Sequence, residues 1–304
     1  MFVADAHADT LYALAIHGQT FDETMITPER LRAGGVGLQT FALFAGTEGP
    51  AGEPYQKGQA MLKAAESLGV PLWKGALPDS PPEAPTGILS IEGGEMLEGS
   101  AERLREFARE GVRMIALTWN CENELAYPAA GDSGRGLKRC GLAILREMDR
   151  LGILADASHL NERGFYEAAE HSSLPIIASH SNCQWLCDVP RNLTRGQVRT
   201  IIQKNGFIGI NFYPRFLKAE GPADTDDILR HIDAVAELGG VSNLGFGSDF
   251  DGIETTPADL TDPAGFPALL RKLLDRGYTQ SQVEGIAGKN LWRVLKEAER
   301  SKQV

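Results

Sequence analysis

The sequence is poor in cysteine, in positive charge and in long apolar runs. Its four cysteines form no CxxC pair, which argues against a disulfide framework, and we interpret them as buried or idle thiols. Only 30 Lys and Arg stand against 41 Asp and Glu, a net charge of -11. This balance argues against binding to nucleic acid or to an anionic membrane surface, because both need basic side chains.

Two further absences narrow the class of protein. No apolar run approaches the ~20 residues of a membrane span, and no basic segment with an apolar stretch opens the sequence. We therefore expect no membrane partner, a cytoplasmic location and a small substrate. Neither GGVG at 34–37 nor EGG at 92–94 has the GxGxxG spacing of a dinucleotide-binding turn, which argues against a doubly wound sheet.

The chain instead alternates short apolar runs with helical patterns. Strands are predicted at 2–6, 36–44, 87–92, 112–118, 153–157, 175–179, 207–212 and 244–248. Helices are predicted at 54–69, 101–110, 138–151, 161–172, 194–205, 225–239, 263–276 and 279–300. Eight strands alternating with helices predict a closed (β/α)8 barrel of the TIM type, with residues 1–304 forming one domain.

Two long connections interrupt this alternation. GTEGPAGEPY (46–55) follows the second predicted strand, and a segment at 120–137 follows the fourth. The second segment belongs to the barrel face on which active sites are built. We interpret it as a loop that gates access to a substrate.

Polar residues follow the predicted strands at the points where the apolar runs stop. They are His7, Asp9, Glu92, His159, His180 and Asp249. Because the carboxyl ends of parallel strands meet at one face of a barrel, we expect these side chains to converge there. Imidazoles and carboxylates together suit Zn, Mn or Fe rather than Ca, so the sequence predicts a metal-dependent hydrolase.

The histidines are the first part of this prediction. In the sequence HAD, His7 and Asp9 alternate onto the same side of the chain and form one half of a metal site. His159 and His180 each end a different strand. The alternative is a pair of hydrogen-bonded histidines without a metal, like the other three histidines of the chain, which occupy helix-like, polar surroundings.

The carboxylates are the second part. A buried Glu92 needs a cation beside it, and its two oxygens can bridge two ions. Two metals roughly 3.5 to 4 Å apart would lower the pKa of a shared water and polarise a carbonyl oxygen. Asp249 would take the proton of that water and pass it to a leaving nitrogen. The alternative roles of Asp249 are a helix N-cap or a metal ligand.

The motifs DAHADT, SIEGGE, LTWN, DASH, ASHSN, RN, NFY and GSDFDG occur in this order between residue 5 and about 252. In this order the sequence resembles the membrane (renal) dipeptidase family of zinc peptidases, in the amidohydrolase superfamily, and specifically a soluble bacterial-type member. The resemblance implies a (β/α)8 barrel with two Zn²⁺ ions and a homodimer. It assigns one ion to His7 and Asp9, the other to His159 and His180, the bridge to Glu92 and the proton shuttle to Asp249.

The resemblance also implies residues that bind the substrate. Arg191 would anchor the carboxylate of a dipeptide, and Tyr213 would line the substrate pocket. The alternatives are a surface salt bridge for Arg191 and a barrel-rim aromatic for Tyr213. Trp119 stands where the mammalian members carry a histidine, and its indole can donate a hydrogen bond but cannot accept a proton. We therefore expect Trp119 to change the substrate range and the stabilisation of the oxyanion.

These observations predict a metal-dependent dipeptidase that hydrolyses dipeptides, including those with a D-configured or unusual C-terminal residue, through a water activated by two zinc ions. Mn²⁺ or Co²⁺ would suit the same ligands. Two alternatives stay open at this point. One is another amidohydrolase that acts on N-acyl amino acids or lactones. The other is a non-catalytic barrel that binds a metal or a peptide.

Overall fold

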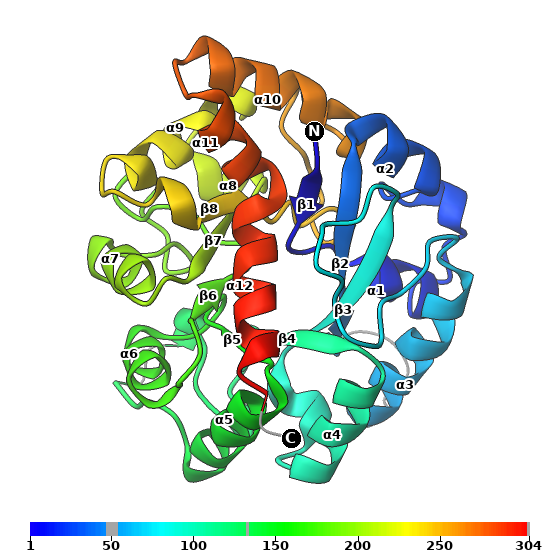
Figure 1. Cartoon of the computed structure of the whole chain (residues 1–304). Helices are drawn as coiled ribbons and strands as arrows, with labels where there is room; N and C mark the ends of the chain where they lie inside the picture. Colours follow the sequence, from blue (N-terminus) through cyan, green and yellow to red (C-terminus); the bar gives the residue numbers. More distant parts are fainter. Residues whose placement is uncertain (47–53, 132–133, 303–304) are drawn as a thin grey trace.

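A computed structural model describes residues 1–46, 54–131 and 134–302. The chain forms a closed barrel of eight parallel strands in the order β1-β2-β3-β4-β5-β6-β7-β8 (Figure 1). The strands are β1 (Val3–Asp5), β2 (Val36–Phe44), β3 (Thr86–Glu92), β4 (Val112–Ala116), β5 (Leu154–Asp156), β6 (Ile177–Ala178), β7 (Phe207–Ile210) and β8 (Leu244–Phe246). The predicted (β/α)8 barrel is confirmed.

Helices surround this barrel. They are α1 (Thr10–Ala15), α2 (Pro28–Gly34), α3 (Pro54–Ala64), α4 (Ala101–Arg109), α5 (Arg139–Leu151), α6 (Glu162–His171), α7 (Arg195–Gln203), α8 (Pro214–Leu217), α9 (Thr225–Ala236), α10 (Phe266–Asp275), α11 (Gln280–Glu284) and α12 (Asn290–Arg300). Among these, none combines the length and the apolar character that crossing a membrane requires.

Several predicted boundaries differ from the structure. β4 to β8 end before their predicted limits, because the last residues of those apolar runs leave the ladder and enter the loops of the site. The sequence analysis did not identify α1 and α2. The predicted helix at 279–300 is divided by a π-helix (Gly285–Lys289), where a Cβ on Gly288 would lie 2.8 Å from the backbone nitrogen of Ala4. Most of the predicted loop at 46–55 lies outside the described residues.

The amino-terminal end of the barrel is sealed by α12. This helix crosses the barrel in Figure 1 and packs Leu291, Trp292 and Leu295 against inward-facing side chains of the strands. Those side chains lie in pairs on neighbouring strands: Ala4 with Leu38, Met114 with Leu154, and Ile177 with Phe207. The packed apolar layer leaves the opposite end, where the strands terminate, for polar side chains.

The barrel closes between β1 and β8 through Asp5. This residue pairs with Phe246 of β8, and its buried carboxylate accepts hydrogen bonds from the backbone N–H of Ser248 (2.8 Å) and the hydroxyl of Ser248 (2.5 Å). The amide of Gln39 in β2 donates a third bond of 3.2 Å to the same carboxylate. Asp5 therefore joins three strands at the point of closure.

We expect Asp5→Ala to lower the free energy of unfolding by about 3 kcal/mol, because buried donors of Ser248 and Gln39 would lose their acceptor. Asp5→Asn keeps an acceptor oxygen and the same shape, and should cost about 1 kcal/mol. Urea denaturation of the two variants and the unchanged chain measures the difference. Equal stability of Asp5→Ala and the unchanged chain would show that this carboxylate does not hold the closure.

Candidate metal centre and active site

Six polar side chains lie together at the carboxyl end of the barrel. Glu92 is the last residue of β3, while His159 and His180 follow β5 and β6. The other three are His7 and Asp9 after β1 and Asp249 after β8. Five of the six are buried, and Asp249 is partly exposed. The structure thus brings together all six residues singled out in the sequence.

Two of these residues have backbone angles in the left-handed region. His159 has φ of 66° and Asp249 has φ of 64°, a conformation that costs non-glycine residues of order 1 kcal/mol or more. Backbone hydrogen bonds hold both in place. The carbonyl of His159 accepts from the N–H of Ala129 (2.7 Å), and the N–H of Asp249 donates to the carbonyl of His7 (3.1 Å). In this backbone conformation both side chains point toward the cluster.

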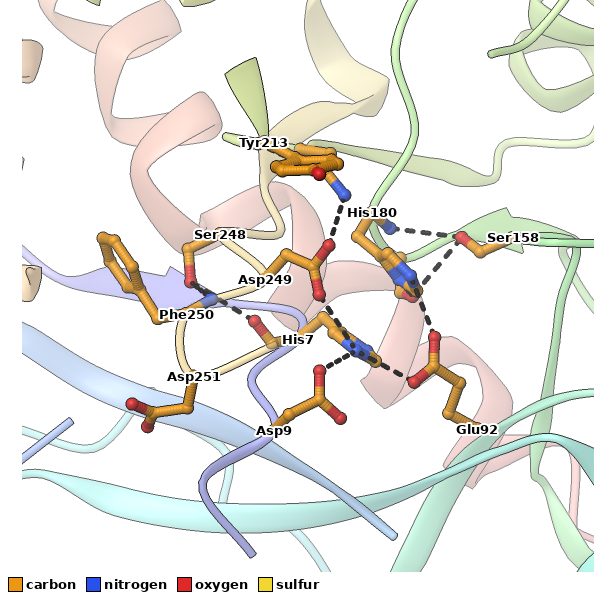
Figure 2. Close-up of polar contacts among 12 residues, drawn as sticks. His7, Asp9, Glu92, Ser158, His180, Tyr213, Ser248, Asp249, Phe250 and Asp251 are labelled. Atoms are coloured by element: carbon orange, nitrogen blue, oxygen red, sulfur yellow. Dashed lines mark hydrogen bonds and ion pairs between the residues drawn. The ribbon is translucent and has the colours of Figure 1, made fainter. Parts of the chain in front are cut away.

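Glu92 lies at the centre of the cluster. One carboxylate oxygen, Oε1, is 2.9 Å from Nε2 of His159 and 3.1 Å from Nε2 of His180. The other, Oε2, is 3.6 Å from Nε2 of His7. Figure 2 shows this carboxylate directed between the rings of His7 and His180, which stack at a centroid distance of 3.8 Å. The two oxygens therefore face two separate sets of ligand atoms.

The outer nitrogens of two imidazoles are oriented by hydrogen bonds. Ser179 donates its hydroxyl proton to Asp156, so its oxygen accepts from Nδ1 of His180 at 2.7 Å. Nδ1 of His159 lies 2.9 Å from Oδ1 of Asn120 and donates to it. Both Nε2 atoms then carry lone pairs, and they lie 3.1 Å apart beside Glu92. Such a convergence of lone pairs fits a cation.

The second set of ligand atoms surrounds His7. Its Nε2 is 3.3 Å from Oδ2 of Asp9 and 3.7 Å from Oδ1 of Asp249. This buried nitrogen and Oδ1 of Asp9 have no hydrogen-bond partner among the described residues. The other oxygen of Asp249 accepts a hydrogen bond of 2.8 Å from Asn211, which fixes the orientation of the carboxylate. Unpartnered buried polar atoms of this kind also fit a bound metal ion.

Burial and mutual charge shift the pKa values of this cluster. Burial, together with neighbouring positive charge, lowers the pKa of His159 and, more strongly, that of His180, which favours neutral imidazoles. Burial opposes the charge of Glu92, but the three histidines hold its pKa well below the usual value. Burial also lowers the pKa of His7, but Glu92 and Asp9 outweigh it and raise that pKa well above its usual value. Burial and Glu92 raise the pKa of Asp9 to about 7.

A cavity of about 280 Å³ opens onto this cluster. Asp9, Glu92, His159 and Asp249 line its inner end. Trp119 and Tyr213 line it as well, so both pocket residues suggested by the resemblance border the cluster. The tyrosine hydroxyl donates a hydrogen bond of 2.6 Å to Glu254, and its pKa is raised to about 12 by burial and by that carboxylate.

Arg191 is partly exposed and lies next to the cavity: its guanidinium approaches the ring of Phe216, a lining residue, at 5.9 Å, although Arg191 is not itself among the lining residues. Its guanidinium donates to the hydroxyl of Ser181 (2.7 Å) and to the carbonyl of His180 (2.9 Å). A guanidinium has five N–H groups, so three remain, including a buried Nε without a partner among the described residues. Burial lowers the pKa of Arg191, while the carboxylates of Asp249 and Glu92 oppose that shift.

Some residues were missed or misplaced by the sequence analysis. His17, grouped with the polar helical histidines, lines the cavity, and Asn120, in the predicted loop 120–137, contacts His159. His231 is fully buried rather than polar in its surroundings, because its ring bonds the N–H of Cys183 and the carbonyl of Leu217. Asn120 lies two residues beyond the predicted strand 112–118, as His159 does beyond 153–157, so a strand end did mark it; no strand end marks His17 or His231. Cys121 is exposed, whereas Cys183 and Cys187 are buried.

A closed parallel barrel that carries imidazoles and carboxylates at its strand ends is typical of metal-dependent hydrolases. The family model of the membrane dipeptidases, Peptidase family M19, matches residues 82–304. The chain therefore belongs to this family.

The chain is also similar to individual proteins. An uncharacterized protein of Klebsiella pneumoniae from the pqqA 5' region is 38% identical over 69% of this chain and 80% of its own length. An uncharacterized dipeptidase of Schizosaccharomyces pombe is 35% identical over 69% of this chain, but the match spans only 52% of that protein. A metallopeptidase from Rhodobacter sphaeroides, liganded with a phosphinate mimic of the dipeptide L-Ala-D-Ala, has the same fold. Its TM-score is 0.86 at 24% identity, with 98% of this chain and 99% of that one covered.

We expect the affinity for Zn²⁺ to rise between pH 6 and pH 8. In the metal-free protein Asp9 has a pKa of about 7, so below that pH it carries a proton that the ion must displace. The raised pKa of His7 acts in the same direction. Calorimetric titration at several pH values measures this slope, which approaches tenfold per pH unit for each proton released.

Two variants test the origin of this slope. Asp9→Asn should bind more weakly and lose part of the slope, because the titrating group is gone. Glu254→Gln removes a carboxylate of the same cavity that accepts its hydrogen bond from Tyr213 rather than from a cluster residue, and should keep the slope. An affinity that does not change with pH in the unchanged protein would contradict coordination by Asp9.

Proposed function

We propose that the protein is a dipeptidase that uses two Zn²⁺ ions to hydrolyse the peptide bond of a dipeptide. The observation that carries this proposal is the position of Glu92, whose two oxygens face His159 and His180 on one side and His7 on the other. A carboxylate placed in this way can bridge two ions. Membership in the dipeptidase family supports the proposed reaction.

The ligands divide into two groups around this bridge. His7 and Asp9 would hold one ion, and His159 and His180 would hold the other. When bound, the two ions would activate a water and polarise the carbonyl oxygen of the substrate. The hydrogen bonds from His159 to Asn120 and from His180 to Ser179 keep the ligand nitrogens directed at the site. Mn²⁺ or Co²⁺ would suit the same ligands.

Asp249 would move the proton. Its Oδ1 faces His7, while its Oδ2 is held by the side-chain amide of Asn211. A carboxylate fixed at the edge of the cavity can take a proton from the attacking water and deliver it to the leaving amine. The partial exposure of Asp249, in contrast to the buried Glu92, leaves it open to the substrate.

Arg191 would bind the carboxylate of the C-terminal residue through the N–H groups that make no hydrogen bond within the described residues. Tyr213 would border the same residue. A protein of this fold binds a phosphinate mimic of L-Ala-D-Ala, which makes a D-configured C-terminal residue part of the proposed substrate range. Trp119 lines the cavity and its indole carries one N–H donor but no charge, so the ions would supply the positive charge that stabilises the carbonyl oxygen of the substrate.

We expect the zinc-loaded protein to release amino acids from dipeptides, and the chelated protein to release none. A panel with L- and D-residues at the C-terminal position measures both activity and stereochemistry. Glu92→Gln should abolish release while its circular dichroism stays unchanged. A panel of N-acyl amino acids and lactones is the control. Turnover of that panel alone, or of neither panel, would contradict a dipeptidase.

We expect Asp249→Asn to lower kcat about 10²- to 10⁴-fold, because a carboxamide keeps the bond to Asn211 but cannot carry a proton. The zinc content of this variant should stay at that of the unchanged protein, as measured by elemental analysis. Asp251→Asn is a matched control, since Asp251 lies in the same turn and bonds Thr10 and Met25. A loss of zinc in Asp249→Asn would make Asp249 a ligand instead.

A further inference from the structure

One side of the cavity is made of aromatic rings. Tyr12, Phe44 and Trp119 line it, and we call these three residues the aromatic wall. The rings of Tyr12 and Phe44 lie 5.0 Å apart, and those of Phe44 and Trp119 lie 4.8 Å apart in an edge-to-face arrangement. Trp119 continues to the ring of His159 at 6.2 Å. The wall therefore reaches from the outer cavity to a residue of the cluster.

The aromatic wall and the proposed carboxylate anchor lie on opposite sides of the barrel mouth. Tyr12 lies in α1 after β1, Phe44 ends β2, and Trp119 follows β4. Arg191 follows β6 and Tyr213 follows β7. Because the strands run in order around a closed barrel, β2 to β4 face β6 to β8 across its axis. Glu92, at the end of β3, lies within the cluster that both sides border.

None of the three side chains of the wall carries a charge. The remaining cavity holds the carboxylates of Asp9, Glu92, Asp249, Asp251 and Glu254. Phe44 and Trp119 are only half-buried, so each presents apolar surface to the cavity. Covering such surface with another apolar group is favourable, and aromatic rings add a geometric preference of their own.

We propose that the aromatic wall binds the side chain of the N-terminal residue of the substrate and selects a large apolar side chain there. This inference rests on the proposed function. With the C-terminal carboxylate at Arg191 and the peptide bond beside Glu92, the N-terminal residue extends toward β2 and β4. An acidic side chain is disfavoured at this position, because it would leave water to lie against the apolar rings of the wall, and the carboxylates of the same cavity repel it.

The test compares two dipeptides that differ only in the N-terminal residue, leucine or glycine, with the C-terminal residue that the panel favours. We expect the zinc-loaded protein to prefer the leucine substrate by at least about tenfold in kcat/KM. Phe44→Ala and Trp119→Ala should each lower this preference by about tenfold, since part of the apolar surface is lost. Trp119→Phe keeps a ring and should keep most of the preference.

Phe216→Ala is the matched control. Phe216 lines the same cavity, but it lies in α8 after β7, and Arg191 approaches its ring at 5.9 Å. Its loss should change kcat/KM for both substrates by the same factor and leave their ratio as it was. Circular dichroism and the thermal unfolding midpoint establish that each variant is folded.

The outcomes separate this inference from the proposed function. Hydrolysis of both dipeptides with a ratio that neither Phe44→Ala nor Trp119→Ala changes would overturn the assignment of the wall and leave the dipeptidase intact. Equal losses for both substrates would also overturn it, because the wall would then only support the site. Absence of hydrolysis of every dipeptide by the unchanged zinc-loaded protein would overturn the proposed function, and the inference with it.

Discussion

The hydrogen bonds between the first and last strands hold the geometry on which the site depends. Beyond the pairing of Asp5 with Phe246, the N–H of Asp249 bonds the carbonyl of His7, and the N–H of Asp9 bonds the carbonyl of Phe250. Each bond joins residues more than 200 positions apart in the sequence. Two proposed ligand residues and the proposed proton carrier are therefore held together, and their geometry is set by barrel closure rather than by a flexible loop.

Electrostatics imposes the second constraint. Glu92 and Asp9 are buried beside His7 and beside two imidazoles, those of His159 and His180, whose Nε2 lone pairs converge, and burying such a set without a cation is costly. In the metal-free protein, protons on His7 and Asp9 relieve part of this cost, as their raised pKa values indicate. Protons and metal ions thus compete for the same lone pairs. The fold maintains a site whose charge is balanced only when something positive occupies it.

The sequence predicted the barrel because strands buried on both faces consist of nearly continuous apolar runs. The carboxyl ends of these strands then identify the face of the barrel that carries the site. The sequence therefore also placed His7, Glu92 and His180 together, although their roles stay predictions. Strand lengths were less predictable, since the last residues of the apolar runs of β4 to β8 lie in the loops that follow the strands. His17 was missed because its approach to the cavity depends on how the chain folds back after α1, which no periodicity encodes. Asn120 closely follows a predicted strand, so its position was available from the sequence, but its bond to His159 was not.

Residues at strand ends and residues in loops have different functions in this molecule: the former form the polar cluster, and the latter form much of the wall that would select the substrate. The six cluster residues lie at or just beyond strand ends, where the ladder fixes them, and the motifs around them carry the family resemblance. Tyr12 and Trp119 instead follow their strands in α1 and in a loop, and such segments tolerate change without disturbing the barrel. A relative can therefore keep the cluster and lose the wall. Family membership accordingly predicts the reaction better than the side chain that the site accepts, and that side chain must be read from the cavity itself.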